Sequence, residues 1–169
     1  VVTLSGPDGY IHDPEGISGE KIEYMLELRA SNQDVVQPYA LEFPEAKFVA
    51  NKRPWEVKCD VAIPCATQNE LDKEDAVTLA KNGCYCVAEG ANMPSTPEAV
   101  EVFMDEKIMF GPGKAVNAGG VATSGLEMSQ NAMKLNWLRD EVDEKLHQIM
   151  VSIHNTCKKH GTEDDGYVN

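Results

Sequence analysis

The chain has 169 residues, of which 42% are hydrophobic and 25% are charged, values that are typical of a soluble globular domain. Its 15 Lys and Arg residues against 28 Asp and Glu residues leave a formal net charge of -13, which opposes binding to the phosphate backbone of a nucleic acid. No apolar run reaches the roughly 18 residues that span a bilayer, and no basic and apolar leader precedes Val1. We expect a soluble, cytoplasmic protein that binds neither nucleic acid nor a membrane.

The first third of the chain predicts strands and helices in alternation. Val1 to Leu4 is a β-branched run that reads as a strand, and the turn-forming residues from Ser5 to Gly9 end it. A helix is expected from an N-cap at Ser18, followed by a short helix over residues 35–42 and a strand over residues 47–50.

The middle of the chain repeats this alternation more clearly. Short apolar runs over residues 60–64, 84–88 and 108–110 predict three strands. Between them, one helix is expected to begin near Asp72 and another at Thr96-Pro97, where a cap is followed by a proline at the first helical position.

The last third is expected to be helical, over residues 120–137 and 140–160. Short strands separated by helices are typical of a doubly wound α/β fold, a Rossmann-like parallel sheet with helices on both faces. We expect residues 1–138 to form a partial dinucleotide-binding domain, and residues 139–169 to add a C-terminal helix and an acidic tail to the same domain.

The five cysteines are odd in number and lack the spacing of a disulfide framework, so we expect reduced, buried thiols. The nearest approaches to a metal site are Cys84 with Cys86, and His154, Cys157 and His160 on one helix. No second cysteine pair lies at zinc-finger spacing, and the two histidines would point about 240° apart around a helix. No metal is therefore expected.

In an open parallel sheet, ligands bind outside the carboxyl ends of the strands, where the N-termini of the following helices also point. The loops expected at that edge are small, polar or glycine-rich, and they cover residues 5–8, 65–67, 89–92, 111–114 and 116–121. Each loop taken alone could simply turn the chain, but together they favour a ligand crevice in which Asn92 and Asn117 offer amide donors and acceptors. No Gly-x-Gly-x-x-Gly motif follows any strand, so the first strand and the phosphate loop are expected upstream of Val1.

Three long segments carry a resemblance to a known family. Residues 64–71 (PCATQNEL), 88–94 (AEGANMP) and 113–131 (GKAVNAGGVATSGLEMSQN) closely resemble the coenzyme-binding domain of bacterial hexameric glutamate dehydrogenases, and the likeness covers essentially the whole chain. The resemblance implies reversible oxidative deamination of L-glutamate to 2-oxoglutarate and ammonia, with hydride passing to a nicotinamide coenzyme.

Site residues follow from the resemblance by position. It implies that Ala66 and Thr67 border the coenzyme, that Asn92 and Asn117 lie beside its ribose and nicotinamide, and that Val121 and Ser124 face glutamate. A hydroxyl in the first turn of a helix is a reasonable partner for a carboxylate, although Ser124 could instead bond to its own backbone.

The segment after the first strand completes the expected coenzyme site with Ser5, Gly6 and Asp8. An acid at this point of a dinucleotide fold usually accepts the ribose 2′-hydroxyl, and no Lys or Arg appears before Lys21, so NAD is favoured over NADP.

The family's catalytic lysine and aspartate belong to an upstream segment that this chain lacks, so no catalytic residue is expected here and the isolated chain is expected to be inactive. The parent protein is expected to be a homo-hexamer, and the fragment a monomer or a weak oligomer. Two alternatives remain open: a dehydrogenase for leucine, valine or phenylalanine, and a non-catalytic nucleotide-binding module.

Overall fold

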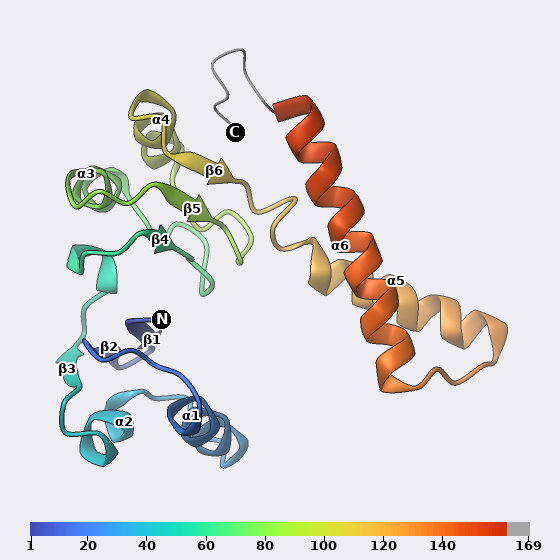
Figure 1. Ribbon diagram of the computed structural model, residues 1–169, viewed down its shortest axis with the longest axis horizontal. Coiled ribbons are helices and arrows are strands. Elements are labelled where there is room, and N and C mark those ends of the chain that lie inside the picture. Colours follow the sequence, from blue (N-terminus) through green and yellow to red (C-terminus); the bar gives the residue numbers. More distant parts are fainter. Residues whose placement is uncertain (162–169) are drawn as a thin grey trace. The chain divides into compact units, whose positions relative to one another are not determined.

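The structure, a computed structural model, describes residues 1–161 as two compact units, one formed by residues 1–59 and one that begins at Asp60 (Figure 1). We call them unit one and unit two. This division differs from the predicted one at residues 138 and 139, which falls between two packed helices of unit two. The predicted acidic tail lies outside the described residues.

Unit one contains a three-stranded antiparallel sheet in the order β1-β2-β3. Its elements are β1 (Thr3–Gly6), β2 (Gly9–His12), α1 (Glu20–Ala30), α2 (Gln37–Glu42), β3 (Lys47–Ala50) and the short 3-10 helix η1 (Pro54–Glu56). The strand expected at the N-terminus is present, but it does not belong to a parallel sheet. Because the chain reverses at Pro7 and Asp8, β1 pairs with β2 in antiparallel register, with Gly6 opposite Gly9.

Two predictions in unit one need correction. The strand β2 was not foreseen, because only Tyr10 and Ile11 stand between turn-forming residues, too few to reveal a period of two. The N-cap of α1 is Gly19 and not Ser18, and no side chain caps that end. The helix is instead held by its contacts with the rest of unit one, where Tyr24 and Met25 pack against the core.

The core of unit one lies between the sheet and the two helices. Ile11 and Tyr39 are fully buried at its centre, together with Ile17, Val36 and Ala46. The rings of Tyr24 and Phe43 meet edge to face with centroids 5.6 Å apart, an arrangement that aromatic pairs favour.

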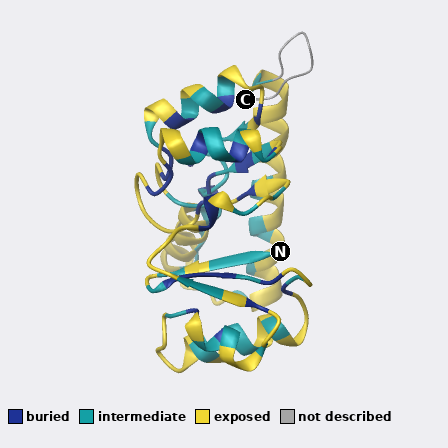
Figure 2. Ribbon diagram, turned by 90° about the vertical axis from the view of Figure 1, so that its left-hand side faces the viewer, coloured by how far each residue is buried: buried dark blue, intermediate teal, exposed yellow. Residues whose placement is uncertain are grey.

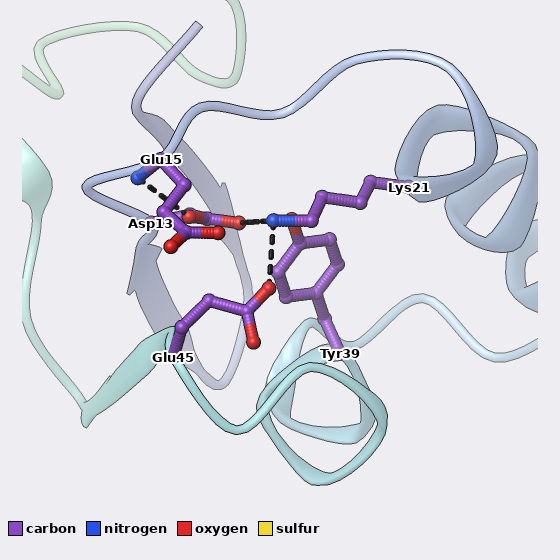
Figure 3. A network of polar contacts seen from close by, with 5 residues as sticks. All are labelled: Asp13, Glu15, Lys21, Tyr39 and Glu45. Atoms are coloured by element: carbon purple, nitrogen blue, oxygen red, sulfur yellow. Dashed lines mark hydrogen bonds and ion pairs between the residues drawn. The ribbon is translucent and has the colours of Figure 1, made fainter.

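A buried carboxylate sits at one end of this core (Figure 3). The oxygens of Asp13 accept hydrogen bonds from the hydroxyl of Tyr39 at 2.6 Å, from Nζ of Lys21 at 2.7 Å and from the backbone N–H of Glu15 at 3.0 Å. Lys21 also pairs with Glu45 at 2.8 Å. Burial by itself would raise the pKa of Asp13, but these donors outweigh it and hold the pKa below its ordinary value.

Unit two contains the parallel sheet, in the order β4-β5-β6. Its strands are β4 (Val61–Ala62), β5 (Cys86–Ala88) and β6 (Met109–Gly111), and their arrows point the same way in Figure 1. They alternate with α3 (Lys73–Lys81) and α4 (Pro97–Asp105), and the helices α5 (Ala118–Met133) and α6 (Arg139–Gly161) follow. The α/β class and the parallel sheet are thus confirmed, with three strands in it.

The starts of α3 and α4 are those that the sequence predicts, whereas α5 begins at Ala118 and not at Gly120, and α6 at Arg139 and not at Asp140. Asp72 caps α3, and its side chain accepts hydrogen bonds from the backbone N–H groups of Glu74 and Asp75. Thr96 caps α4 by accepting from the N–H of Ala99, with Pro97 at the first helical position. The two helices pack against each other, and α4 also contacts β6, where Phe103 lies against Phe110.

The C-terminal helices form a separate pair within unit two. Gly119 of α5 faces Leu146 and Met150 of α6, and a Cβ at this position would make ordinary van der Waals contacts with both side chains. No residue of α6 is buried, whereas α3 and α4 each bury two side chains (Figure 2). None of the helices in residues 1–161 is long and apolar enough to cross a membrane.

The cysteines were expected to be buried thiols, and this is wrong for two of them. Cys84 is buried, but Cys65 and Cys157 are exposed. Within the described residues, no group of three or more His, Cys, Asp or Glu side chains is placed to hold a metal ion.

Candidate functional site

The three strands of unit two end at the same edge of the sheet, and the loops that follow them are joined by hydrogen bonds. The loop after β4 meets the loop after β5 where the N–H groups of Gly90 and Ala91 both donate to the carbonyl of Pro64, at 3.0 and 3.1 Å. Further along the same two loops, the N–H of Asn69 donates to the carbonyl of Met93 at 3.0 Å. This edge of the sheet is therefore a connected surface.

Glu89 links the loop after β5 to the loop after β6. The residue is 5% exposed, its Oε2 accepts from the N–H of Gly113 at 2.6 Å, and its Oε1 accepts from the N–H of Ser95 at 3.2 Å. A carboxylate is costly to bury unless its oxygens are hydrogen-bonded, and here both oxygens have backbone donors.

The loop after β6 reaches the same place through Gly113 and Asn117. A Cβ at Gly113 would lie 2.5 Å from the carbonyl oxygen of Ala91, so only glycine permits this close approach of two backbones. Asn117, the N-cap of α5, donates from its side-chain amide to the same carbonyl at 3.2 Å.

Four of the predicted coenzyme residues lie on these joined loops. Ala66, Thr67 and Asn92 are exposed at the carboxyl edge, and Asn117 is half-buried. The N–H of Ala66 donates to the buried carboxylate of Glu70 at 2.8 Å, which holds the loop after β4 in place. The prediction that these loops share one edge is confirmed, and what the residues bind remains a prediction.

The other three predicted coenzyme residues, Ser5, Gly6 and Asp8, belong to unit one. The argument that placed them on the edge of the parallel sheet is wrong, because they end a strand of the antiparallel sheet. The carboxylate of Asp8 is already engaged at the start of α2, where it accepts from the N–H groups of Val36 and Gln37 at 2.9 to 3.1 Å.

The two predicted substrate residues lie on α5, three positions apart and so on one face of the helix. Val121 is 73% exposed, and Ser124 is also exposed. Ser124 is the seventh residue of α5, so the expectation that it lies in the first turn is wrong. Thr123 and Ser129 bond to the carbonyls of their own helix, whereas no such bond forms from Ser124 within residues 1–161.

Glu89 and Ser95 are residues of this edge that the sequence did not single out. A charged residue directly after a buried strand was the available signal for Glu89. The hydroxyl of Ser95 is buried without a hydrogen-bond partner in the described part of the chain, and nothing in the sequence pattern marks it. The edge also holds Met93 in the left-handed region with φ 51, a conformation that few non-glycine residues adopt.

Cys65 lies on the loop after β4, and its sulfur is close to Gly90, where a Cβ would collide with it. Although the residue as a whole is exposed, partial burial of its sulfur and the nearby charge of Glu70 raise the pKa of this thiol above its ordinary value. It is therefore protonated near neutral pH and a weak nucleophile.

The sequence profile described as Glutamate/Leucine/Phenylalanine/Valine dehydrogenase matches residues 1–168. The chain belongs to this dehydrogenase family. Within the family it is similar to the NAD-specific glutamate dehydrogenase of Bacteroides fragilis strain YCH46, with 69% identity over 169 residues that cover 100% of this chain and 38% of that protein. It is also similar to the NADP-specific glutamate dehydrogenase of Escherichia coli K12, with 48% identity over 165 residues that cover 98% of this chain and 37% of that protein.

Solved structures of family members agree in fold. The crystal structure of Plasmodium falciparum glutamate dehydrogenase superposes with a TM-score of 0.89 at 45% identity, over 95% of this chain and 34% of that one. The chain thus spans well under half the length of the curated dehydrogenases that it matches.

Proposed function

We propose that this chain is the coenzyme-binding part of a glutamate dehydrogenase, which catalyses the reversible NAD(P)-dependent oxidative deamination of L-glutamate to 2-oxoglutarate and ammonia. The observation that carries the proposal is the joined edge of the parallel sheet, where the loops after the three strands meet at the place where parallel sheets bind nucleotides. The identity of 69% to an NAD-specific glutamate dehydrogenase supports the same conclusion.

In this proposal, unit two supplies the parallel part of a doubly wound, Rossmann-like sheet with helices on both faces. The first strand of that sheet and the glycine-rich phosphate loop would lie outside this chain. Residues 1–138 would then be a partial coenzyme-binding domain, to which residues 139–169 add the last helix and the tail.

The residues at the joined edge fit a nicotinamide coenzyme in their chemistry. Thr67 and Asn92 are exposed and neutral, and offer a hydroxyl and an amide, groups that hydrogen-bond both to ribose hydroxyls and to a carboxamide. We assign Ala66 and Thr67 to the border of the coenzyme, and Asn92 and Asn117 to its ribose and nicotinamide. When bound, the coenzyme accepts the hydride from the substrate.

Ser5, Gly6 and Asp8 remain proposed coenzyme contacts, although they lie at the end of β1 in the antiparallel sheet of unit one. The argument for NAD now rests on the NAD-specific relative rather than on a free Asp8 carboxylate, because α2 already engages that carboxylate. NADP is the alternative coenzyme, since an NADP-specific glutamate dehydrogenase also matches.

Glutamate would contact α5 through Val121 and Ser124. Both side chains are exposed and therefore accessible to a ligand. Within the described residues, the Ser124 hydroxyl forms no hydrogen bond to a carbonyl of its own helix, unlike Thr123 and Ser129. A homo-hexamer and a cytoplasmic location are part of the same proposal for the parent protein.

A substrate and coenzyme panel tests this function. The full-length protein that carries this chain is given glutamate, leucine, valine or phenylalanine, each with NAD or NADP, and reduced coenzyme is measured by its absorbance. We expect turnover of glutamate with NAD. Preference for leucine, valine or phenylalanine would move the protein to another branch of the family, and nucleotide binding without any turnover would make it a non-catalytic module.

A further inference from the structure

Glu89 is the most deeply buried acid of unit two among the described residues, and none of the proposed contacts to coenzyme or substrate uses it. Its side chain leaves the sheet directly after β5 and reaches two other segments of the edge. One is the loop after β6, through the N–H of Gly113 at 2.6 Å, and the other is the segment before α4, through the N–H of Ser95 at 3.2 Å. We call this set of three residues the Glu89 bridge.

The bridge lies between the two loops that carry the asparagines of the proposed site. Asn92 follows Glu89 by three residues, and Asn117 follows Gly113 by four. The loops meet again at Ala91, whose carbonyl accepts the amide of Asn117 and would lie 2.5 Å from a Cβ on Gly113. A small shift of Gly113 relative to Glu89 would therefore change the spacing of both asparagines.

We propose that Glu89 is a positioning residue, which sets the spacing between the loops of Asn92 and Asn117 through its bonds to Ser95 and Gly113 and thereby controls coenzyme binding. This inference rests on the proposed function, because it assumes that the two asparagines contact a nicotinamide coenzyme. Glu89 itself is buried beneath the loops and is not assigned a contact with the coenzyme.

The bridge requires a carboxylate and not merely a polar side chain of the same size. Both partners of Glu89 are backbone N–H donors, so both side-chain oxygens must accept. Glu89→Gln keeps the shape but replaces one acceptor with an NH₂ donor, which would face another donor. One of the two hydrogen bonds is lost, which leaves the N–H of Gly113 or of Ser95 without its acceptor. That N–H is buried and can bond to water only if its loop moves.

The test uses the full-length protein that carries this chain, in wild-type form and as Glu89→Gln. We expect the KM for coenzyme to rise about tenfold, the effect of losing one hydrogen bond to a charged group, with the KM for glutamate changed by less than about twofold. Hydrogen exchange measured by mass spectrometry over residues 90–96 and 111–117 is expected to be faster in the variant, a readout that needs no activity.

Thr96→Ala is the matched control. Thr96 follows Ser95 and caps α4 through the N–H of Ala99, so its loss lowers stability next to the bridge without removing either bond of Glu89. We expect a lower Tm with an unchanged KM for coenzyme and unchanged exchange over residues 111–117.

The outcomes separate the two proposals. If wild type turns over glutamate and Glu89→Gln changes the coenzyme KM no more than Thr96→Ala does, Glu89 is only structural and the inference is overturned. Unchanged exchange over both residues 90–96 and residues 111–117 in Glu89→Gln overturns it as well, whatever the activity. If wild type has no coenzyme-dependent activity and binds no coenzyme, the proposed function fails first, and the coenzyme role of Glu89 fails with it.

Discussion

At the scale of single residues, Ser124 and Thr123 offer a direct comparison on α5. Both are hydroxyl side chains on exposed positions, but Thr123 donates to the carbonyl of Gly119 at 2.9 Å, whereas Ser124 forms no such bond in the described residues. The proposed role of Ser124 is a hydrogen bond to the side-chain carboxylate of glutamate. Because the hydroxyl of Thr123 bonds to its own helix, substitution of Thr123 provides a control for substitution of Ser124.

We predict that Ser124→Ala in the full-length protein raises the KM for glutamate about tenfold, because a hydrogen bond to a charged group contributes about 1.5 kcal/mol or more. The KM for coenzyme should change little. Steady-state kinetics with varied glutamate measures this, and Thr123→Ala serves as the control with a near-wild-type KM. Equal effects of the two substitutions would remove Ser124 from the substrate site.

A second residue-scale prediction concerns how the stability of the folded state depends on pH through the carboxylate of Asp13. Because its donors hold the pKa of Asp13 below the ordinary value of about 3.9, the folded state favours the ionised form. The resulting stability is fully present above about pH 4 and is lost as the pH falls through the lower pKa of the folded state. Tyr39→Phe removes one of the donors and should cost about 1 to 3 kcal/mol near neutral pH.

Urea unfolding of the 169-residue chain, with and without Tyr39→Phe and compared at several pH values, checks this prediction. The only tryptophan of unit one is Trp55, so a Trp137→Phe background in both proteins lets fluorescence report on that unit. The difference in unfolding free energy between the two proteins should shrink as the pH falls below about 4. A difference that is the same at neutral and acid pH would contradict the assigned charge of Asp13.

At the scale of elements, the helices that begin with a strong cap are those whose starts the sequence located. Thr96 caps α4 as predicted, and Asp72, which the sequence placed near the start of α3, is its N-cap. A side-chain acceptor at the N-cap satisfies N–H groups that the helix itself leaves unpaired. The start of α1 was misplaced by comparison, since Gly19 stands at its N-cap without any side-chain acceptor. Local chemistry therefore decides some boundaries, and tertiary packing decides others.

The cap of α3 gives the element-scale prediction. Asp72→Ala removes the acceptor for the N–H groups of Glu74 and Asp75. It also weakens the reciprocal hydrogen bond from the backbone N–H at position 72 to the carboxylate of Asp75, because the capping box no longer holds the two residues together. We expect a loss of about 1 kcal/mol in the free energy of unfolding, measured by urea denaturation with circular dichroism. Asp72→Ser retains an acceptor and should lose much less; a serine variant as unstable as the alanine variant would argue against the cap.

The strands illustrate the same division. The parallel strands of unit two were recognised because each is an apolar run followed by a loop and a helix. In unit one, the reversal at Pro7 and Asp8 makes β1 the partner of β2, which no local pattern announced. A strand's sequence indicates that it is extended and half-buried, but not which strand will pair with it.

At the scale of the whole molecule, the chain spans 38% of the Bacteroides fragilis relative and 37% of the Escherichia coli relative named above. The catalytic lysine and aspartate that the family resemblance implies have no counterpart in the residues proposed for this chain. We predict that the purified 169-residue chain does not turn over glutamate with either coenzyme, because the resemblance implies that the groups that transfer protons lie in a segment outside it. The full-length protein is the positive control, and measurable turnover by the chain alone would contradict the prediction.

The site was predictable in part. The loops at residues 65–67, 89–92 and 112–117 share an edge because the carboxyl ends of parallel strands must do so, and this could be deduced from the order of strands and helices alone. The contacts of Asp8 could not be predicted, because they come from a distant part of the chain. An acid that follows a strand is a suitable acceptor for a ribose hydroxyl. The oxygens of Asp8, however, already accept hydrogen bonds from the N–H groups at the start of α2, and the sequence does not show that α2 lies beside Asp8.

What the sequence by itself determined is the set of local elements, the α/β class and the family, because caps, apolar runs and long motifs are properties of neighbouring residues. Only the tertiary structure decided that the first three strands form an antiparallel sheet of their own, that Asp8 serves α2, and that Glu89 joins two loops. These are contacts between residues far apart in the chain. Their energies depend on burial and on hydrogen-bond geometry, which no local pattern contains.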